Sequence, residues 1–163
     1  MSISRDRSTS QRDETDSNQH AAKVLVIEDD TNELETLSEL LQLKGFNPTK
    51  AQNAHEGLTH AKNDKYDIAL IDINLPDRNG LEILQIFNRN YRDMINIIIT
   101  GHSSLEAATK AMEYGADGYL EKNYNFETLE KLMTKCLDKK RKNNNRAIDR
   151  QEISLMSKFY EPL

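Results

Sequence analysis

Five short apolar runs, separated by helical patterns, constrain the fold of this chain more than any other feature. Several runs are apolar at consecutive positions, as at 24–27 and 97–99, whereas a strand with one wet face would alternate apolar and polar residues. Strands that are buried on both faces are typical of a parallel sheet between two layers of helices. The five runs lie at 23–27, 46–50, 67–71, 95–99 and 117–120.

Helical patterns with recognisable caps fill the segments between these runs. The first helix is expected after a cap at Asp30 or Thr31, with Gly45 as its stop. The other four helices are expected after Asn53, near Gly80, after Ser103 or Ser104, and after Asn125. Five alternating β–α units predict an α/β fold, with a doubly wound, five-stranded parallel sheet and helices on both faces.

The composition changes at both ends of the chain. Residues 1–20 are almost entirely polar, which predicts a disordered N-terminal tail. Residues 21–140 are expected to form the folded domain, and residues 141–163 a basic linker with a short amphipathic tail. In that tail Ile153, Met156 and Tyr160 have the spacing of one helix face. The favoured interpretation is a short helix docked on its own domain, with a partner-binding segment and plain disorder as alternatives.

Charge and composition narrow the classes of function. The net charge of −5 gives no support to nucleic acid as the main partner, and the basic run at 139–146 is expected to be solvated. No apolar run approaches the length of a membrane span, and residues 1–18 contain no apolar signal-peptide core. The lone Cys136, expected in the core, rules out an internal disulfide and suits a cytoplasmic location.

Polar side chains follow the apolar runs at the points where the predicted strands end. In an open parallel sheet, ligands bind beyond the carboxyl ends of the strands, so these side chains should converge on one rim. Each of them alone is commonly a helix cap or a surface charge, but their joint placement indicates a site. The set comprises Glu28, Asp29, Asp30, Asp72, Thr100, Glu121 and Lys122.

The chemistry of this set indicates phosphoryl transfer. Carboxylates packed together repel one another unless a cation neutralises them. Oxygen ligands without a nearby His/Cys cluster favour Mg²⁺ over Zn²⁺. A carboxylate beside Mg²⁺ can attack phosphorus and form an aspartyl phosphate, whose oxygens a metal ion and a lysine can stabilise. A neighbouring threonine hydroxyl could donate a hydrogen bond to the attached group.

The sequence resembles the receiver domain of two-component response regulators over residues 21–140. The matching stretches are 24–30, 71–80, 99–102 and 115–122. The resemblance implies a fold like that of the chemotaxis regulator, in which the strand order is 2-1-3-4-5. Residues 141–163 are too few for a helix-turn-helix domain, so a stand-alone receiver is expected. The resemblance implies that Asp72 accepts a phosphoryl group from a sensor histidine kinase or a histidine phosphotransfer protein. Mg²⁺ would be held by Glu28, Asp29, Asp72 and the backbone carbonyl of Asn74.

The resemblance also assigns the remaining site residues. Thr100 and Lys122 would contact the phosphoryl group, and Thr100 and Tyr119 would be the switch pair that responds to it. Tyr119 could alternatively be a half-buried strand aromatic without a switching role. The family usually has a cis proline after the lysine, whereas Asn123 stands there in this chain. A cis bond before a residue other than proline costs about 2.5–4 kcal/mol, and the sequence alone leaves open whether this bond is cis or trans.

The resulting functional expectation is a signalling receiver whose only catalysis is its own phosphorylation and dephosphorylation. Its output would be docking on an unidentified protein target, without direct nucleic acid binding or membrane insertion. Phosphorylation-dependent homodimers are also compatible with the family, through the face of the fourth and fifth helices. Two other functions stay open: a pseudo-receiver that binds proteins without phosphorylation, and an aspartyl-phosphate phosphatase.

Overall fold

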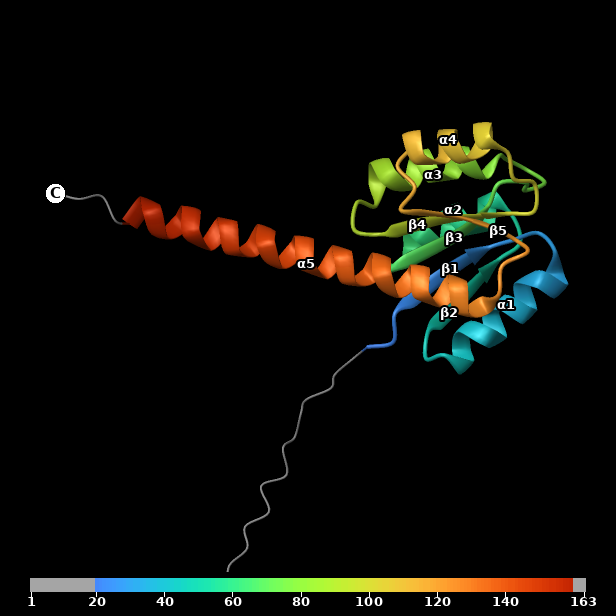
Figure 1. The fold of residues 1–163 in the computed structure, drawn as a ribbon, viewed down its shortest axis with the longest axis horizontal. Helices are drawn as coiled ribbons and strands as arrows, with labels where there is room; N and C mark the ends of the chain where they lie inside the picture. The colour runs from blue at the N-terminus through green and yellow to red at the C-terminus, as the bar shows by residue number, and fades with distance from the viewer. Residues whose placement is uncertain (1–19, 160–163) are drawn as a thin grey trace, which may run out of the picture.

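Five parallel strands alternate with five helices in the computed structural model, which describes residues 20–159 (Figure 1). Every strand begins and ends within one residue of the run predicted for it. The disordered tail was predicted for residues 1–20, of which 1–19 lie outside the described part. The elements are β1 (Lys23–Ile27), α1 (Thr31–Leu43), β2 (Asn47–Ala51), α2 (Ala54–Asn63), β3 (Ile68–Asp72), α3 (Gly80–Asn90), β4 (Ile95–Thr100), α4 (Leu105–Glu113), β5 (Gly118–Glu121) and α5 (Phe126–Phe159).

The sheet has the strand order β2-β1-β3-β4-β5, and all neighbouring strands are parallel. This confirms the doubly wound α/β fold. Helices α2, α3 and α4 pack on one face of the sheet, around Leu25, Ile71 and Phe87. Helices α1 and α5 pack on the other face, around Val26 and Leu70. Figure 1 shows α3 and α4 above the sheet and α1 and α5 below it.

Burial explains which strands could be recognised as apolar runs. Every residue of β3 and β4 is buried, because these strands lie inside the sheet and have helices on both faces. Strand β2 lies at an edge, and only its last residue, Ala51, is buried. The polar residues Asn47 and Lys50 are therefore tolerated in β2, where they would be costly in β3.

Side-chain caps start the helices where the sequence places them. The N-caps of α1, α2 and α4 are Asp30, Asn53 and Ser104, and each side chain accepts a hydrogen bond from a backbone N–H in the first turn. Asn125 accepts a hydrogen bond from the Thr128 N–H in the same way at the start of α5. Gly45, with φ of 86°, follows the last turn of α1, as expected for its stop.

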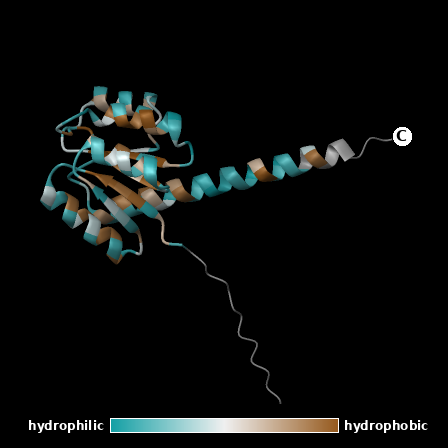
Figure 2. Cartoon of the chain, turned by 180° about the vertical axis from the view of Figure 1, so that it is seen from behind, coloured by the Kyte–Doolittle hydropathy of each residue, from teal (hydrophilic) through white to brown (hydrophobic). Residues whose placement is uncertain are grey.

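The C-terminal part of α5 differs from the prediction. No linker separates the domain from a short tail helix: α5 runs through 34 residues as one helix. The basic run favoured a linker by its polarity, yet its Lys and Arg residues are good helix formers, and no Gly or Pro interrupts residues 126–159. The distal part projects away from the domain as a mainly hydrophilic rod instead of docking on it (Figures 1 and 2). Tyr160 of the predicted apolar face lies outside the described residues.

None of the helices in the described part of the chain is both long and apolar enough to cross a bilayer.

Candidate functional site

Three carboxylates meet beyond the carboxyl ends of β1 and β3. Glu28 and Asp29 directly follow β1, and Asp72 is the last residue of β3. Each residue offers an oxygen that lies within 4.8 Å of the oxygens of the other two. Glu28 and Asp72 are 6% and 5% exposed, whereas Asp29 is exposed. The predicted cluster therefore forms, with two buried carboxylates and one that faces solvent.

Backbone amides and a close approach of the chain hold two of these carboxylates in place. The Asp30 N–H donates to Glu28 Oε1 at 3.0 Å, and the Asn74 N–H donates to Asp72 Oδ1 at 3.1 Å. Gly80 lies against the backbone of Asp72, where an added Cβ would stand 2.0 Å from the Asp72 carbonyl oxygen. The start of α3 can therefore approach the end of β3 this closely only without a side chain at position 80.

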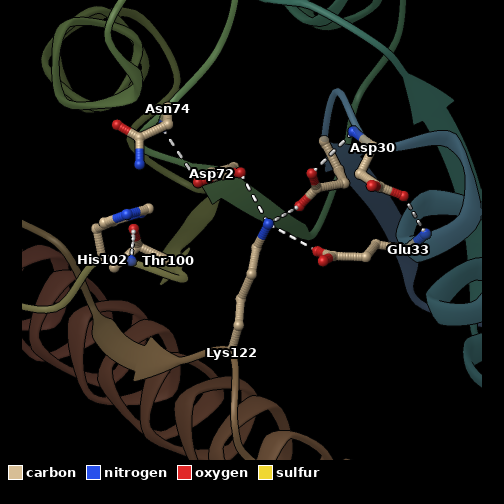
Figure 3. Close-up of polar contacts among 8 residues, drawn as sticks. Asp30, Glu33, Asp72, Asn74, Thr100, His102 and Lys122 are labelled. Carbon is tan, nitrogen blue, oxygen red and sulfur yellow. Dashed lines mark hydrogen bonds and ion pairs between the residues drawn. The ribbon is translucent and has the colours of Figure 1, made fainter.

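The ammonium of Lys122 lies among three carboxylates. Its Nζ is 2.8 Å from Glu28 Oε2, 3.0 Å from Asp72 Oδ2 and 2.7 Å from Glu33 Oε2 (Figure 3). The Lys122 backbone N–H donates to the Thr100 carbonyl at 3.0 Å, which extends the β4–β5 pairing to the lysine. No cis peptide bond occurs among the described residues, so the bond from Lys122 to Asn123, which the sequence left undecided, is trans.

The carboxylates of the site outnumber the ammonium of Lys122. Burial raises the pKa of Glu28 to about 7, and the charge of Asp72 adds to this, although Lys122 and the Asp30 amide oppose it. Burial would lower the pKa of Lys122, but hydrogen bonds to the three carboxylates outweigh it and leave that pKa above its usual range. A divalent cation bound by carboxylate oxygens would relieve this repulsion, so the residues present fit Mg²⁺.

The predicted switch residues lie on the next two strands. Thr100 is fully buried at the end of β4, and its Oγ1 accepts a hydrogen bond from the His102 N–H at 3.3 Å. Tyr119 lies on β5, pairs with Ile98 and packs against the core on the side of α3 and α4. Its hydroxyl is buried and has no hydrogen-bond partner among the described residues. Tyr119 thus belongs to the core beside the site and not to the carboxylate cluster.

Sequence reasoning missed three residues around the site. Glu33 lies in the first turn of α1, whereas the polar residues predicted for the site lie at or just after strand ends. The carboxylate of Asp77 accepts the backbone N–H groups of Ala54 and His55, each at 2.9 Å, and ties the β3–α3 loop to the start of α2. Burial raises the pKa of Tyr124 to about 12. Tyr124, Glu33 and Lys122 help to line a cavity of about 350 Å³, and Glu28 and Asp72 of the cluster line it as well.

The sequence also matches a known family. The model described as the response regulator receiver domain matches residues 24–134. This chain belongs to the response regulator receiver domain family. The family is that of two-component signalling systems, and the recognition made from the motifs is confirmed.

Relatives and solved structures agree with this assignment. A CheY-like receiver domain protein from Methanospirillum hungatei has a TM-score of 0.74 and 32% identity, and the match covers 76% of this chain and 99% of that one. The structure of TrrA from Thermotoga maritima in complex with Mg²⁺ and BeF has a TM-score of 0.65 and 30% identity, covering 71% of this chain and 98% of that one.

The curated relatives are longer proteins. A cyclic di-GMP phosphodiesterase from Thermotoga maritima is 31% identical over 114 residues, which are 70% of this chain and 30% of that protein. The cell cycle transcriptional regulator CtrA from Caulobacter vibrioides is 32% identical over 107 residues, or 66% of this chain and 46% of the relative. The chain therefore spans less than half the length of these relatives, and the match concerns the receiver domain.

Proposed function

We propose that this receiver domain accepts a phosphoryl group on Asp72 in a Mg²⁺-dependent reaction and signals by changing its contacts with other proteins. One observation carries the proposal. Asp72 is buried beside two further carboxylates and within 3.0 Å of the Lys122 ammonium, at the carboxyl edge of a parallel sheet. This arrangement combines a nucleophile, an oxygen-rich place for a cation and a fixed positive charge.

Each residue of the site has its own role in the phosphoryl transfer. Asp72 supplies the nucleophilic oxygen, while Glu28, Asp29 and the Asn74 carbonyl would complete the metal site with it. Bound Mg²⁺ would neutralise charge on the phosphoryl oxygens. An Asp72 oxygen forms the new bond to phosphorus, the phosphorus–nitrogen bond of a phosphohistidine breaks, and its electron pair returns to the imidazole nitrogen. The amide that donates to Asp72 Oδ1 keeps the carboxylate oriented during this step.

Thr100 and Tyr119 would transmit the change at Asp72 to the surface. The hydroxyl of Thr100 would donate to a phosphoryl oxygen and move toward Asp72. The buried hydroxyl of Tyr119 has no hydrogen-bond partner among the described residues, and such a group typically costs about 1–3 kcal/mol. This cost supports a role for Tyr119 as a side chain that changes rotamer, because its present position is not strongly favoured.

The proposed partners are a sensor histidine kinase or a histidine phosphotransfer protein as donor, and a protein target that recognises the phosphorylated state. The complex of TrrA with Mg²⁺ and BeF supports a metal-dependent site in a similar protein. We further propose that the domain acts in the cytoplasm and that phosphorylation can promote a homodimer.

Intact-mass measurement with acetyl phosphate and Mg²⁺ tests this function. The wild-type protein should gain the mass of one phosphoryl group, and EDTA should prevent the gain. Asp72→Asn should fold normally but remain unlabelled, because the amide is nearly isosteric and not nucleophilic. Labelling of Asp72→Asn at the wild-type rate would show that another residue is the acceptor. A wild-type protein that never labels would instead be a pseudo-receiver, and continuous phosphate release from a small phosphomonoester would indicate a phosphatase.

A further inference from the structure

We propose that Glu33 is a positioning residue that competes with the phosphoryl group for the ammonium of Lys122. This inference rests on the function proposed above and concerns the same site. Glu33 is not a member of the carboxylate cluster that could hold a metal ion. It nevertheless makes the shortest of the three contacts to Lys122, at 2.7 Å (Figure 3).

The contact with Glu33 matters because the Lys122 ammonium has few hydrogen-bond donors. An ammonium has three N–H donors, and three carboxylates already lie within 3.0 Å of the Lys122 nitrogen. A phosphoryl oxygen on Asp72 can gain a hydrogen bond from Lys122 only if one of these contacts is given up. A cation among the cluster would weaken the attraction of Glu28 and Asp72 for the lysine, because it neutralises their charge. Glu33 would keep its full charge and remain the competitor.

Exposure indicates that this contact can break without disrupting the fold. The side chain of Glu33 is 52% exposed, whereas those of Glu28 and Asp72 are 8% and 5% exposed. A half-exposed carboxylate that loses its partner can be solvated by water, whereas a buried one cannot. Glu33 also lies in the first turn of α1, where its negative charge is favourable without Lys122. The contact therefore acts as a reversible restraint between α1 and the loop after β5.

Beryllofluoride, a mimic of the phosphoryl group, provides the test. It is titrated at saturating Mg²⁺ into the wild-type protein, with binding followed by the backbone amide signals of Thr100 and Lys122. Glu33→Gln removes the competing charge. We expect it to lower the half-saturating concentration of beryllofluoride about two- to fivefold, the range that corresponds to a half-exposed ion pair. Mg²⁺ affinity, measured separately without beryllofluoride, should change less than this.

Two further variants separate contact from charge. Glu33→Asp keeps the charge but shortens the side chain, so the loss of contact should tighten beryllofluoride binding as Glu33→Gln does. Glu35→Gln is the matched control, because Glu35 lies on the same helix but pairs with Lys50 at 2.8 Å on the edge strand. This control should bind beryllofluoride as the wild type does.

The other outcomes distinguish a failure of the Glu33 inference from a failure of the proposed function. If Glu33→Gln and Glu33→Asp bind beryllofluoride as the wild type does, or more weakly, Glu33 does not compete for Lys122. If Glu33→Gln alone tightens binding, the effect is simple charge repulsion and the positioning role is wrong. If the wild-type protein itself does not bind beryllofluoride in Mg²⁺, the proposed phosphoryl-accepting function fails, whatever Glu33 does.

Discussion

Replacing Lys122 by methionine should destabilise the metal-free protein and much less the Mg²⁺-bound protein. The ammonium contacts Glu28 and Asp72, whose side chains are almost fully buried. Methionine has a similar unbranched length, so the space along the lysine stem stays filled. The substitution therefore removes the positive charge but little packing, and it leaves two neighbouring carboxylates without their cation.

The contacts of the lysine set the size of the effect. A hydrogen bond to a charged group contributes about 1.5–3 kcal/mol, and the half-exposed pair with Glu33 adds less than about 1 kcal/mol. Part of this is recovered because the mutant no longer pays the desolvation of the ammonium. The unfolding free energy of the metal-free mutant should thus fall by about 2–4 kcal/mol. Mg²⁺ would neutralise the same carboxylates, so saturating metal should shrink the deficit to below about 1 kcal/mol.

Urea unfolding followed by circular dichroism, with EDTA and with Mg²⁺, measures both quantities. Lys110→Met is the matched control, because Lys110 pairs with Glu106 at 2.8 Å on the exposed face of α4. It should change stability little in either condition. A metal-free Lys122→Met protein as stable as the wild type would refute the view that Lys122 neutralises the cluster. A deficit that persists unchanged in Mg²⁺ would show that the metal does not bind these carboxylates.

Two other substitutions probe the same rim. Asp29→Ala should make the metal-free protein more stable by reducing repulsion, and should reduce the stabilisation that Mg²⁺ gives in thermal unfolding; an unchanged response to Mg²⁺ would contradict the assignment of Asp29 as a ligand. Gly80→Ala should lower the unfolding free energy in urea by about 1–3 kcal/mol, because the new Cβ would overlap the Asp72 carbonyl and backbone cannot yield as a side chain can. Gly101→Ala, whose Cβ would stand 3.5 Å from Lys122 Cδ, is its control and should fold normally; equal stabilities of these two variants would contradict the close approach at Gly80.

The fold could be predicted because its three central strands, β1, β3 and β4, are buried on both sides. Residues such as Ile97 and Ile98 point to opposite faces of the sheet, and each face is covered by helices. Consecutive apolar residues therefore identified the strands, and short polar caps such as Asn53 located the helix starts between them. The strand order required the family resemblance as well, because periodicity does not say which strands are neighbours.

The site could be predicted only as far as the topology determines it. Parallel strands bring the residues after β1 and β3 to one edge, so the meeting of Glu28, Asp29 and Asp72 follows from the fold. The end of α5 could not be located in the same way. A polar run without Gly or Pro is compatible both with a solvated linker and with a continuing helix, and polarity alone does not decide between them.

The partners of Lys122 could not be predicted from the sequence, for a geometric reason. A lysine side chain has four rotatable bonds, so a residue placed at the end of β5 can reach any acceptor along a wide arc of the rim. The strand pattern placed Lys122 and Asp72 at one rim of the sheet, but it did not predict the contact between them. Glu33 belongs to a helix and not to a strand. It lies in the first turn of α1, three residues after the cap at Asp30, so the strand pattern does not predict its position. An acidic residue in the first turn of a helix that follows a strand end is the sequence signal for such a partner. Because an ammonium has only three donors, each further acceptor reduces the number of donors that the lysine can offer to a phosphoryl group.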